Sequence, residues 1–182
     1  MLPQPDSLLV GSTPCSDAAR KSGMSCSVLT HDEEQTQMAL WSMASAPLQM
    51  SNDLRAVPAA SRAILLNREV IAVQSDPLGR MCFRFMANET SGAQGWRKEL
   101  LGGEVAVALV NMGSTHALSI GFELRDAGFA PDTNVRVRDL FKAPAAQDLG
   151  VFAGAFRPSA PLAPHAVQML RLSFEPQYKA GL

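Results

Sequence analysis

Carboxylate and amide side chains gather at three places near the start of the chain. Asp6 follows a proline-rich opening, Asp32–Glu34 is a run of three acids, and Asn52–Arg55 combines an amide, a carboxylate and a guanidinium. Carboxylates can act as general acids, bases or nucleophiles, and amide and guanidinium groups can bind polar substrate atoms. The chemistry that these groups can perform depends on the elements that position them.

The acidic run has a structural explanation. Thr30 and Glu33 have the spacing of a capping box, in which each side chain satisfies a main-chain amide at the start of a helix. Acidic side chains also suit the positive end of the helix dipole. The spacing predicts a helix from His31 to Ala46 that ends at Pro47, and it gives the acids a capping role rather than a catalytic one.

Residues 1–80 show a β/α pattern. The first predicted elements are a buried strand at Leu8–Gly11, the helix just described and a short strand at Leu48–Ser51. A second helix from Pro58 through Leu66 follows. Val70–Val73 is extended or begins the exit segment, and Asp76–Gly79 is a turn. Two such units cannot close a barrel or cover both faces of a sheet. The segment is therefore interpreted as the end of a larger α/β domain.

Residues 81–182 are predicted to form an antiparallel β-sandwich. Short β-rich runs recur, and Gly102-Gly103 indicates a hairpin between two of them. The runs are Cys82–Met86, Gly95–Leu100, Glu104–Asn111, Ala117–Glu123, Val135–Leu140, Val151–Phe156 and Val167–Phe174. The change of pattern places the boundary between the two domains near Asp76–Arg80.

Composition excludes some function classes. The chain is 18% charged with a net charge of −1, which gives no electrostatic reason to expect a nucleic acid or an anionic membrane as partner. No apolar run approaches the roughly 20 residues of a membrane span. The first residues lack the basic and apolar regions of a secretory signal. No Cys-x-x-Cys motif or His pair suggests a metal site.

Three motifs carry a family resemblance. They are Thr36-Gln-Met-Ala-Leu-Trp41, Met50-Ser-Asn-Asp-Leu-Arg55 and Asp76-Pro-Leu-Gly79. In residue identity and order, these motifs resemble the second half of glycoside hydrolase family 27, which includes α-galactosidases and α-N-acetylgalactosaminidases. The resemblance implies the last two β/α units of a (β/α)8 TIM barrel over residues 1–80, followed by a C-terminal antiparallel β-sandwich over residues 81–182.

The resemblance also implies site residues. Pro5-Asp6-Ser-Leu-Leu is similar to a family motif at strand seven, which makes Asp6 and Ser7 candidate substrate-binding residues. A solvated Asp6 remains the alternative. Asn52, Asp53 and Arg55 are candidates for pocket support, or for loop structure through hydrogen bonds and an ion pair.

The family hydrolyses terminal α-linked galactose with retention, and the resemblance places its two catalytic carboxylates upstream of this stretch. We therefore expect no catalytic residue, no cofactor and no turnover from this chain alone. An α-galactoside glycan or glycoconjugate is the implied partner, a homodimer is a further expectation, and a secreted or lysosome-like location follows from the family. The alternative is a non-catalytic β-sandwich module that binds carbohydrate or another partner.

Two covalent features remain as alternatives, a glycan at one asparagine and a disulfide between two cysteines. Asn88-Glu89-Thr90 has the pattern of a glycosylation acceptor at Asn88. Cys15 and Cys26 flank a loop rich in Ser and Gly and could form a disulfide that closes it, or remain free thiols.

Overall fold

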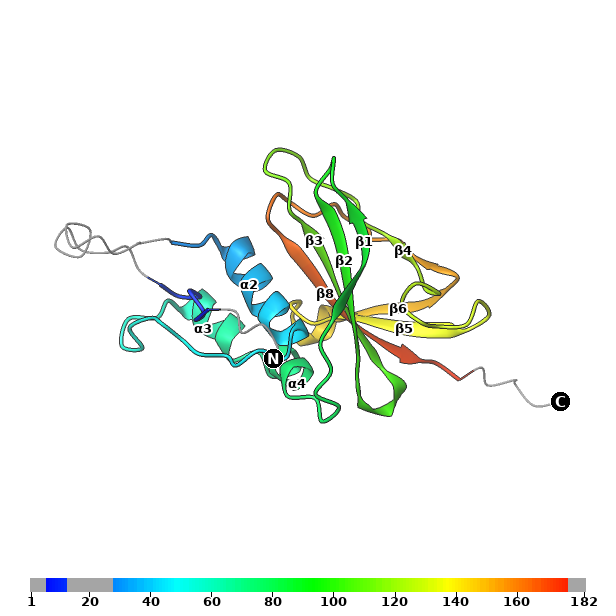
Figure 1. The fold of residues 1–182 in the computed structure, drawn as a ribbon, viewed down its shortest axis with the longest axis horizontal. Coiled ribbons are helices and arrows are strands. Elements are labelled where there is room, and N and C mark those ends of the chain that lie inside the picture. The colour runs from blue at the N-terminus through cyan, green and yellow to red at the C-terminus, as the bar shows by residue number, and fades with distance from the viewer. Residues whose placement is uncertain (1–5, 13–27, 177–182) are drawn as a thin grey trace.

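The computed structural model describes residues 6–12 and 28–176. Three helices come first in these residues: α2 (His31–Met43), α3 (Ala59–Leu65) and α4 (Arg68–Gln74). The strands that follow are β1 (Phe83–Asn88), β2 (Ala93–Glu99), β3 (Val105–Asn111), β4 (Phe122–Glu123), β5 (Asn134–Asp139), β6 (Asp148–Ala153), β7 (Ala155–Phe156) and β8 (Val167–Phe174). Figure 1 shows the helices together on one side of the large sheet.

The barrel-like segment retains one parallel contact. Leu8 pairs with Met50 in an isolated parallel bridge, in which the Leu8 amide donates to the Gln49 carbonyl at 2.7 Å and the Ser51 amide donates to the Leu8 carbonyl at 3.1 Å. The predicted strands at Leu8–Gly11 and Leu48–Ser51 are thus reduced to this bridge. A strand of a closed barrel is stabilised by neighbours on both sides, and here the described residues supply one neighbour.

Helix α2 begins as predicted and ends earlier. Both hydrogen bonds of the Thr30–Glu33 capping box are present. The helix ends at Met43 rather than Ala46, because Ser45 takes a left-handed conformation with φ of 52°. The Ala46 amide then donates to the Trp41 carbonyl at 3.0 Å, which is the closing bond of a Schellman motif.

Replacing Thr30 by alanine is expected to lower the free energy of unfolding by about 1 kcal/mol, because the cap of α2 loses its acceptor. Hydrogen bonds from Thr30 hold the pKa of Glu33 below its ordinary value of 4.5. The stabilisation from Glu33 is therefore complete above that value and is lost as pH falls through the lower folded pKa. Urea titrations at neutral and acidic pH measure both effects. The exposed Thr115→Ala variant is the control, and equal losses in the two variants would contradict the capping role.

The segment predicted as extended at Val70–Val73 is helical. It forms most of α4, where Val70 and Val73 are buried. The Asn67 side chain accepts hydrogen bonds from the amides of Glu69 and Val70 and so caps this helix. The turn at Asp76–Gly79 is confirmed, since the Gly79 amide donates to the Asp76 carbonyl at 2.9 Å and Gly79 has a φ of 59°.

The sandwich consists of two antiparallel sheets. The large sheet has the strand order β1-β2-β3-β8-β5-β6, and β4 pairs with β7 in a small second sheet. The predicted hairpin at Gly102-Gly103 connects β2 with β3, and both glycines have positive φ. The last strand, Val167–Phe174, has the predicted bounds.

Strand β3 shows why the large sheet is covered on both faces. All of its residues are buried. Val105, Val107 and Leu109 pack in the cluster that also contains residues of the small sheet. The alternate residues Ala106, Ala108 and Val110 pack instead with Met38 and Met43 of α2. The helices and the large sheet therefore share one hydrophobic core, and the two sheets share another.

Candidate functional site

Asp6 and Ser7 lie beside the last turn of α2. The Asp6 carbonyl accepts a hydrogen bond from Trp41 Nε1 at 2.7 Å, which anchors the main chain. The exposed Asp6 carboxylate accepts from the Ser7 amide through Oδ1 at 2.7 Å. Within the described residues, no donor is recorded for Asp6 Oδ2.

Asn52 supports the end of the parallel pair. Its Nδ2 donates to the Val10 carbonyl at 2.7 Å, and its Oδ1 is buried without a hydrogen-bond partner in the described part of the chain. Gly11 has a φ of 78°, and a Cβ there would lie 3.0 Å from Asn52 Nδ2 and 2.9 Å from Val57. Glycine at this position therefore permits the close approach of the two segments.

Asp53 and Arg55 bind each other at the surface. Arg55 Nε donates to Asp53 Oδ1 at 2.9 Å, and Nη2 donates to Oδ2 at 2.8 Å. The Arg55 guanidinium holds the pKa of the Asp53 carboxyl below its ordinary value. Because both groups are exposed, this pair orders the loop and adds little to stability.

A groove lies beside Met50 on this segment. It has a volume of about 240 Å³ and is lined by Met50, Leu54, Arg55, Val57, Arg62, Leu65 and Leu66. Leu54 and Leu66 are each 66% exposed, so the groove is an open surface that combines apolar side chains with Arg55 and Arg62. No carboxylate is among its lining residues.

The predicted site residues do not meet in one pocket. In the parallel pairing of Leu8 with Met50, Asp6 and Ser7 precede the bridge, whereas Asn52 and the residues after it follow the bridge. Arg55 reaches the groove, but the structure gives no direct contact between Asp6 and Asn52. Their roles in binding stay predictions.

Glu34 is a buried residue that the sequence did not single out for contacts. It is 7% exposed, accepts from the Gly11 amide at 2.7 Å, and accepts from Ser61 Oγ at 2.8 and 3.0 Å. It thus ties the first parallel segment to α2 and α3. In the sequence it is one of three acids in a first helical turn, and no local signal distinguishes it from Asp32.

Lys98 was also missed, and it joins the helices to the sheet. It is fully buried in β2, and its Nζ donates to the Ser42 carbonyl at 3.2 Å, to Ser45 Oγ at 2.7 Å and to the Val73 carbonyl. Ser42 and Val73 lie in the last turns of α2 and α4, where a cation suits the helix dipole. Burial nevertheless holds the pKa of Lys98 below its ordinary value.

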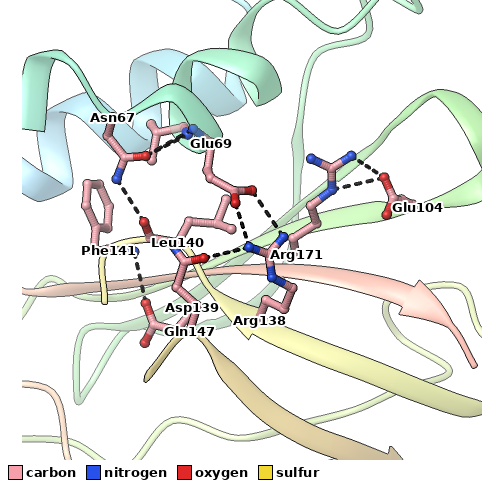
Figure 2. Close-up of polar contacts among 10 residues, drawn as sticks. Asn67, Glu69, Glu104, Arg138, Asp139, Leu140, Phe141, Gln147 and Arg171 are labelled. Carbon is pink, nitrogen blue, oxygen red and sulfur yellow. Dashed lines mark hydrogen bonds and ion pairs between the residues drawn. The ribbon is translucent and has the colours of Figure 1, made fainter. Parts of the chain in front are cut away.

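Further polar contacts cross the same boundary. Figure 2 shows Asn67 donating to the Leu140 carbonyl and Arg138 reaching Glu69 and Gln147. The Asn67 bond is 2.8 Å, and the Arg138–Glu69 pair is about one third exposed on each side. The helical segment is therefore held to the sandwich by directed bonds as well as by apolar packing.

The remaining predicted sites lie elsewhere. Asn88 is exposed, and its Oδ1 accepts from the amides of Thr90 and Ser91, so the glycosylation prediction remains open. Cys15 and Cys26 fall outside the described residues. Cys82 is a free, half-buried thiol whose pKa is raised by burial.

The described residues contain no group of three or more His, Cys, Asp or Glu side chains that could hold a metal ion. No helix among them is long and apolar enough to cross a membrane.

Comparison with family models gives two matches in chain order. Residues 5–76 match the model described as alpha galactosidase A, and residues 90–172 match the alpha galactosidase C-terminal beta sandwich domain. Both matches agree with the predicted order of a barrel end followed by a sandwich.

Curated relatives are similar over different shares of the chain. Human alpha-galactosidase A is 30% identical over 147 residues, which make up 79% of this chain and 33% of the relative. Alpha-galactosidase 3 of Arabidopsis thaliana is 34% identical over 63% of this chain and 26% of the relative. An alpha-N-acetylgalactosaminidase of Gallus gallus is 45% identical over 51 residues, or 28% of this chain and 13% of the relative. The chain thus spans about a third or less of the length of these relatives.

A solved structure has the same fold. The GH27 β-L-arabinopyranosidase of Geobacillus stearothermophilus superposes with a TM-score of 0.78 and 25% identity over 99% of this chain and 38% of that one. The superposition covers nearly all of this chain, and together with the two family-model matches it confirms the predicted fold class.

Proposed function

Because the chain belongs to glycoside hydrolase family 27, the α-galactosidase family, we propose that it forms the barrel-closing units and the sandwich of a retaining glycosidase for terminal α-linked galactose. The observation that carries this proposal is the open groove beside Met50. Its exposed apolar residues suit the packing of a neighbouring β/α unit, and no carboxylate is among its lining residues.

The chemistry needs two carboxylates about 5–5.5 Å apart, one to attack the anomeric carbon and one to protonate the leaving oxygen. In the proposal, both come from a segment outside residues 1–182. This chain contributes Asp6, whose free carboxylate oxygen accepts a hydrogen bond from a sugar hydroxyl, and Ser7 beside it. Asn52 holds the neighbouring main chain in place through Val10.

The proposal also includes the partners and compartment of the whole protein. Its substrate is an α-galactoside glycan or glycoconjugate, its location is secreted or lysosome-like, and it forms a homodimer. The exposure of Asn88 is compatible with glycosylation during secretion.

The purified chain is expected to show no hydrolysis of an aryl α-galactoside above the buffer rate, because the proposal places both catalytic carboxylates outside this chain. Co-expression with the barrel segment that ends before strand seven of a family relative should restore hydrolysis. In the restored complex, Asp6→Ala should lower kcat/KM by about 10–100-fold through loss of a charge-assisted hydrogen bond.

Asp132→Ala is the matched control, since Asp132 is exposed in the sandwich. Hydrolysis by the chain alone that survives Asp6→Ala would contradict the proposed division of roles. Restored activity that is unaffected by Asp6→Ala would contradict the binding role of Asp6.

A further inference from the structure

Trp41 makes a polar contact that the proposed function does not use. It lies in the last turn of α2, and its half-buried ring packs against the core that the helices share with the large sheet. The indole N–H is a donor at a fixed place on a rigid ring. It donates to the Asp6 carbonyl at 2.7 Å. A ring that the core holds in place thus supports the main chain at the candidate substrate ligand.

This hydrogen bond acts on one peptide unit. The Asp6 carbonyl and the Ser7 amide belong to the same planar unit, so a bond that fixes the carbonyl also fixes the direction of the Ser7 N–H. That N–H donates to Asp6 Oδ1 at 2.7 Å. The indole of Trp41 is therefore connected to the Asp6 carboxylate by two consecutive hydrogen bonds and one rigid peptide unit.

The rest of the segment is held by other groups. The parallel bridge fixes Leu8, and side chains of α2 accept from the amides of Leu9 and Gly11 at 2.8 and 2.7 Å. Within the described residues, these bonds leave out the peptide unit that follows Asp6. Loss of the indole donor would therefore release this unit while the segment after it stays in place.

We propose that Trp41 is a positioning residue, whose indole N–H holds the peptide unit that orients the Asp6 carboxylate. This role rests on the proposed function, in which Asp6 binds a sugar hydroxyl. It also gives the last residue of the Thr36–Trp41 motif a part in substrate binding, although Trp41 acts through Asp6 and does not itself bind the sugar. Because the bond is exposed to water, its loss should weaken binding several-fold rather than abolish it.

Two replacements of Trp41 test its effect on Asp6 in the full chain. Trp41→Phe removes the donor and shortens the ring. Replacement by benzothienylalanine keeps the ring size and exchanges the N–H for sulfur, so it isolates the bond even where Trp41→Phe fails to fold. NMR coupling constants between the α and β protons of Asp6 measure its side-chain rotamer. We expect one dominant rotamer in the wild type and averaged couplings in both variants.

Trp96→Phe is the matched control, because Trp96 Nε1 donates to Gln94 within the sandwich. The chain has two tryptophans, so the two replacements cover both indole donors. Trp96→Phe should leave the Asp6 couplings at their wild-type values.

Kinetics of the complex restored with a relative's barrel segment test the role in binding. Trp41→Phe should raise KM about three- to tenfold and change kcat by less than about twofold, because it removes uniform binding. A general loss of folded protein would instead lower kcat at constant KM. In the Asp6→Ala background, Trp41→Phe should have no further effect on KM, since it acts through that carboxylate.

The outcomes separate this role from the proposed function. Averaged Asp6 couplings in the wild type, or wild-type couplings in both Trp41 variants, would overturn the positioning role. An equal rise of KM with Trp41→Phe in the presence and absence of the Asp6 carboxylate would also overturn it. A restored wild-type complex without hydrolysis would contradict the proposed function, whereas the coupling constants would still decide whether Trp41 orients Asp6.

Discussion

Replacing Lys98 by methionine is expected to lower the free energy of unfolding by about 3–5 kcal/mol. Methionine preserves much of the apolar stem but removes the ammonium group. The carbonyls of Ser42 and Val73 and the hydroxyl of Ser45 then lose their common donor in a buried place. The loss is partly offset because the variant no longer buries a charge, which is why the estimate is below the sum of three charge-assisted bonds.

The effect of Lys98 should also depend on pH. Burial lowers its pKa from the ordinary value of 10.5, while the charges of Asp76 and Cys82 oppose that shift. Between the folded pKa and 10.5, the unfolded chain binds more protons than the folded chain, so the stability that Lys98 contributes rises with pH. The difference between the wild type and Lys98→Met should therefore be larger near the ordinary pKa than at neutral pH.

Urea unfolding of both proteins at the two pH values measures these differences. Lys142→Met is the matched control, because Lys142 is exposed and its loss should change stability by less than about 0.5 kcal/mol. Equal destabilisation by the two substitutions would show that the buried contacts of Lys98 contribute no net stability. A smaller difference at high pH would contradict the direction of its pKa shift.

The sandwich was largely predictable because its strands carry strong local patterns. Val167–Phe174 alternates apolar residues in a run bounded by turn residues, and the structure gives the same bounds. Val70–Val73 shows the limit of this reasoning. A short apolar run suits a strand or a buried helix, and the choice was made by Asn67, whose side chain caps α4. The short strands of the barrel segment depend on neighbours that local sequence does not reveal.

The polar contacts that join segments far apart in the chain could not be predicted from local sequence. Lys98 bonds to groups 25 and 56 positions away, and Gln168 bonds to Asp139 across 29 positions. Their neighbours in sequence are ordinary strand residues. The pairing of Asp53 with Arg55 was predictable, because two positions separate them and their charges are opposite.

Replacing Glu34 by leucine is expected to lower the free energy of unfolding by about 2–4 kcal/mol. The Gly11 amide and the Ser61 hydroxyl would lose their acceptor, and both are buried. Glu34→Gln keeps one side-chain carbonyl oxygen that can accept from the Gly11 amide. The Ser61 hydroxyl can rotate and accept a hydrogen bond from the new side-chain NH2 group. We therefore expect the glutamine variant to lose less than half as much stability.

A double-mutant cycle tests whether Glu34 acts through Ser61. Ser61→Ala removes one of the two donors, so Glu34→Leu should cost less in that background than in the wild type, by about 1 kcal/mol. Hydrogen exchange at the Gly11 amide should accelerate in Glu34→Leu, whereas exchange in β3 should follow the global stability alone. Additive losses would mean that the bond to Ser61 contributes nothing, and unchanged exchange at Gly11 would mean that Glu34 does not hold this segment. If both effects are found, a single buried carboxylate fixes the parallel segment that carries Asp6, and so sets the position of the side chain that we propose as a sugar ligand.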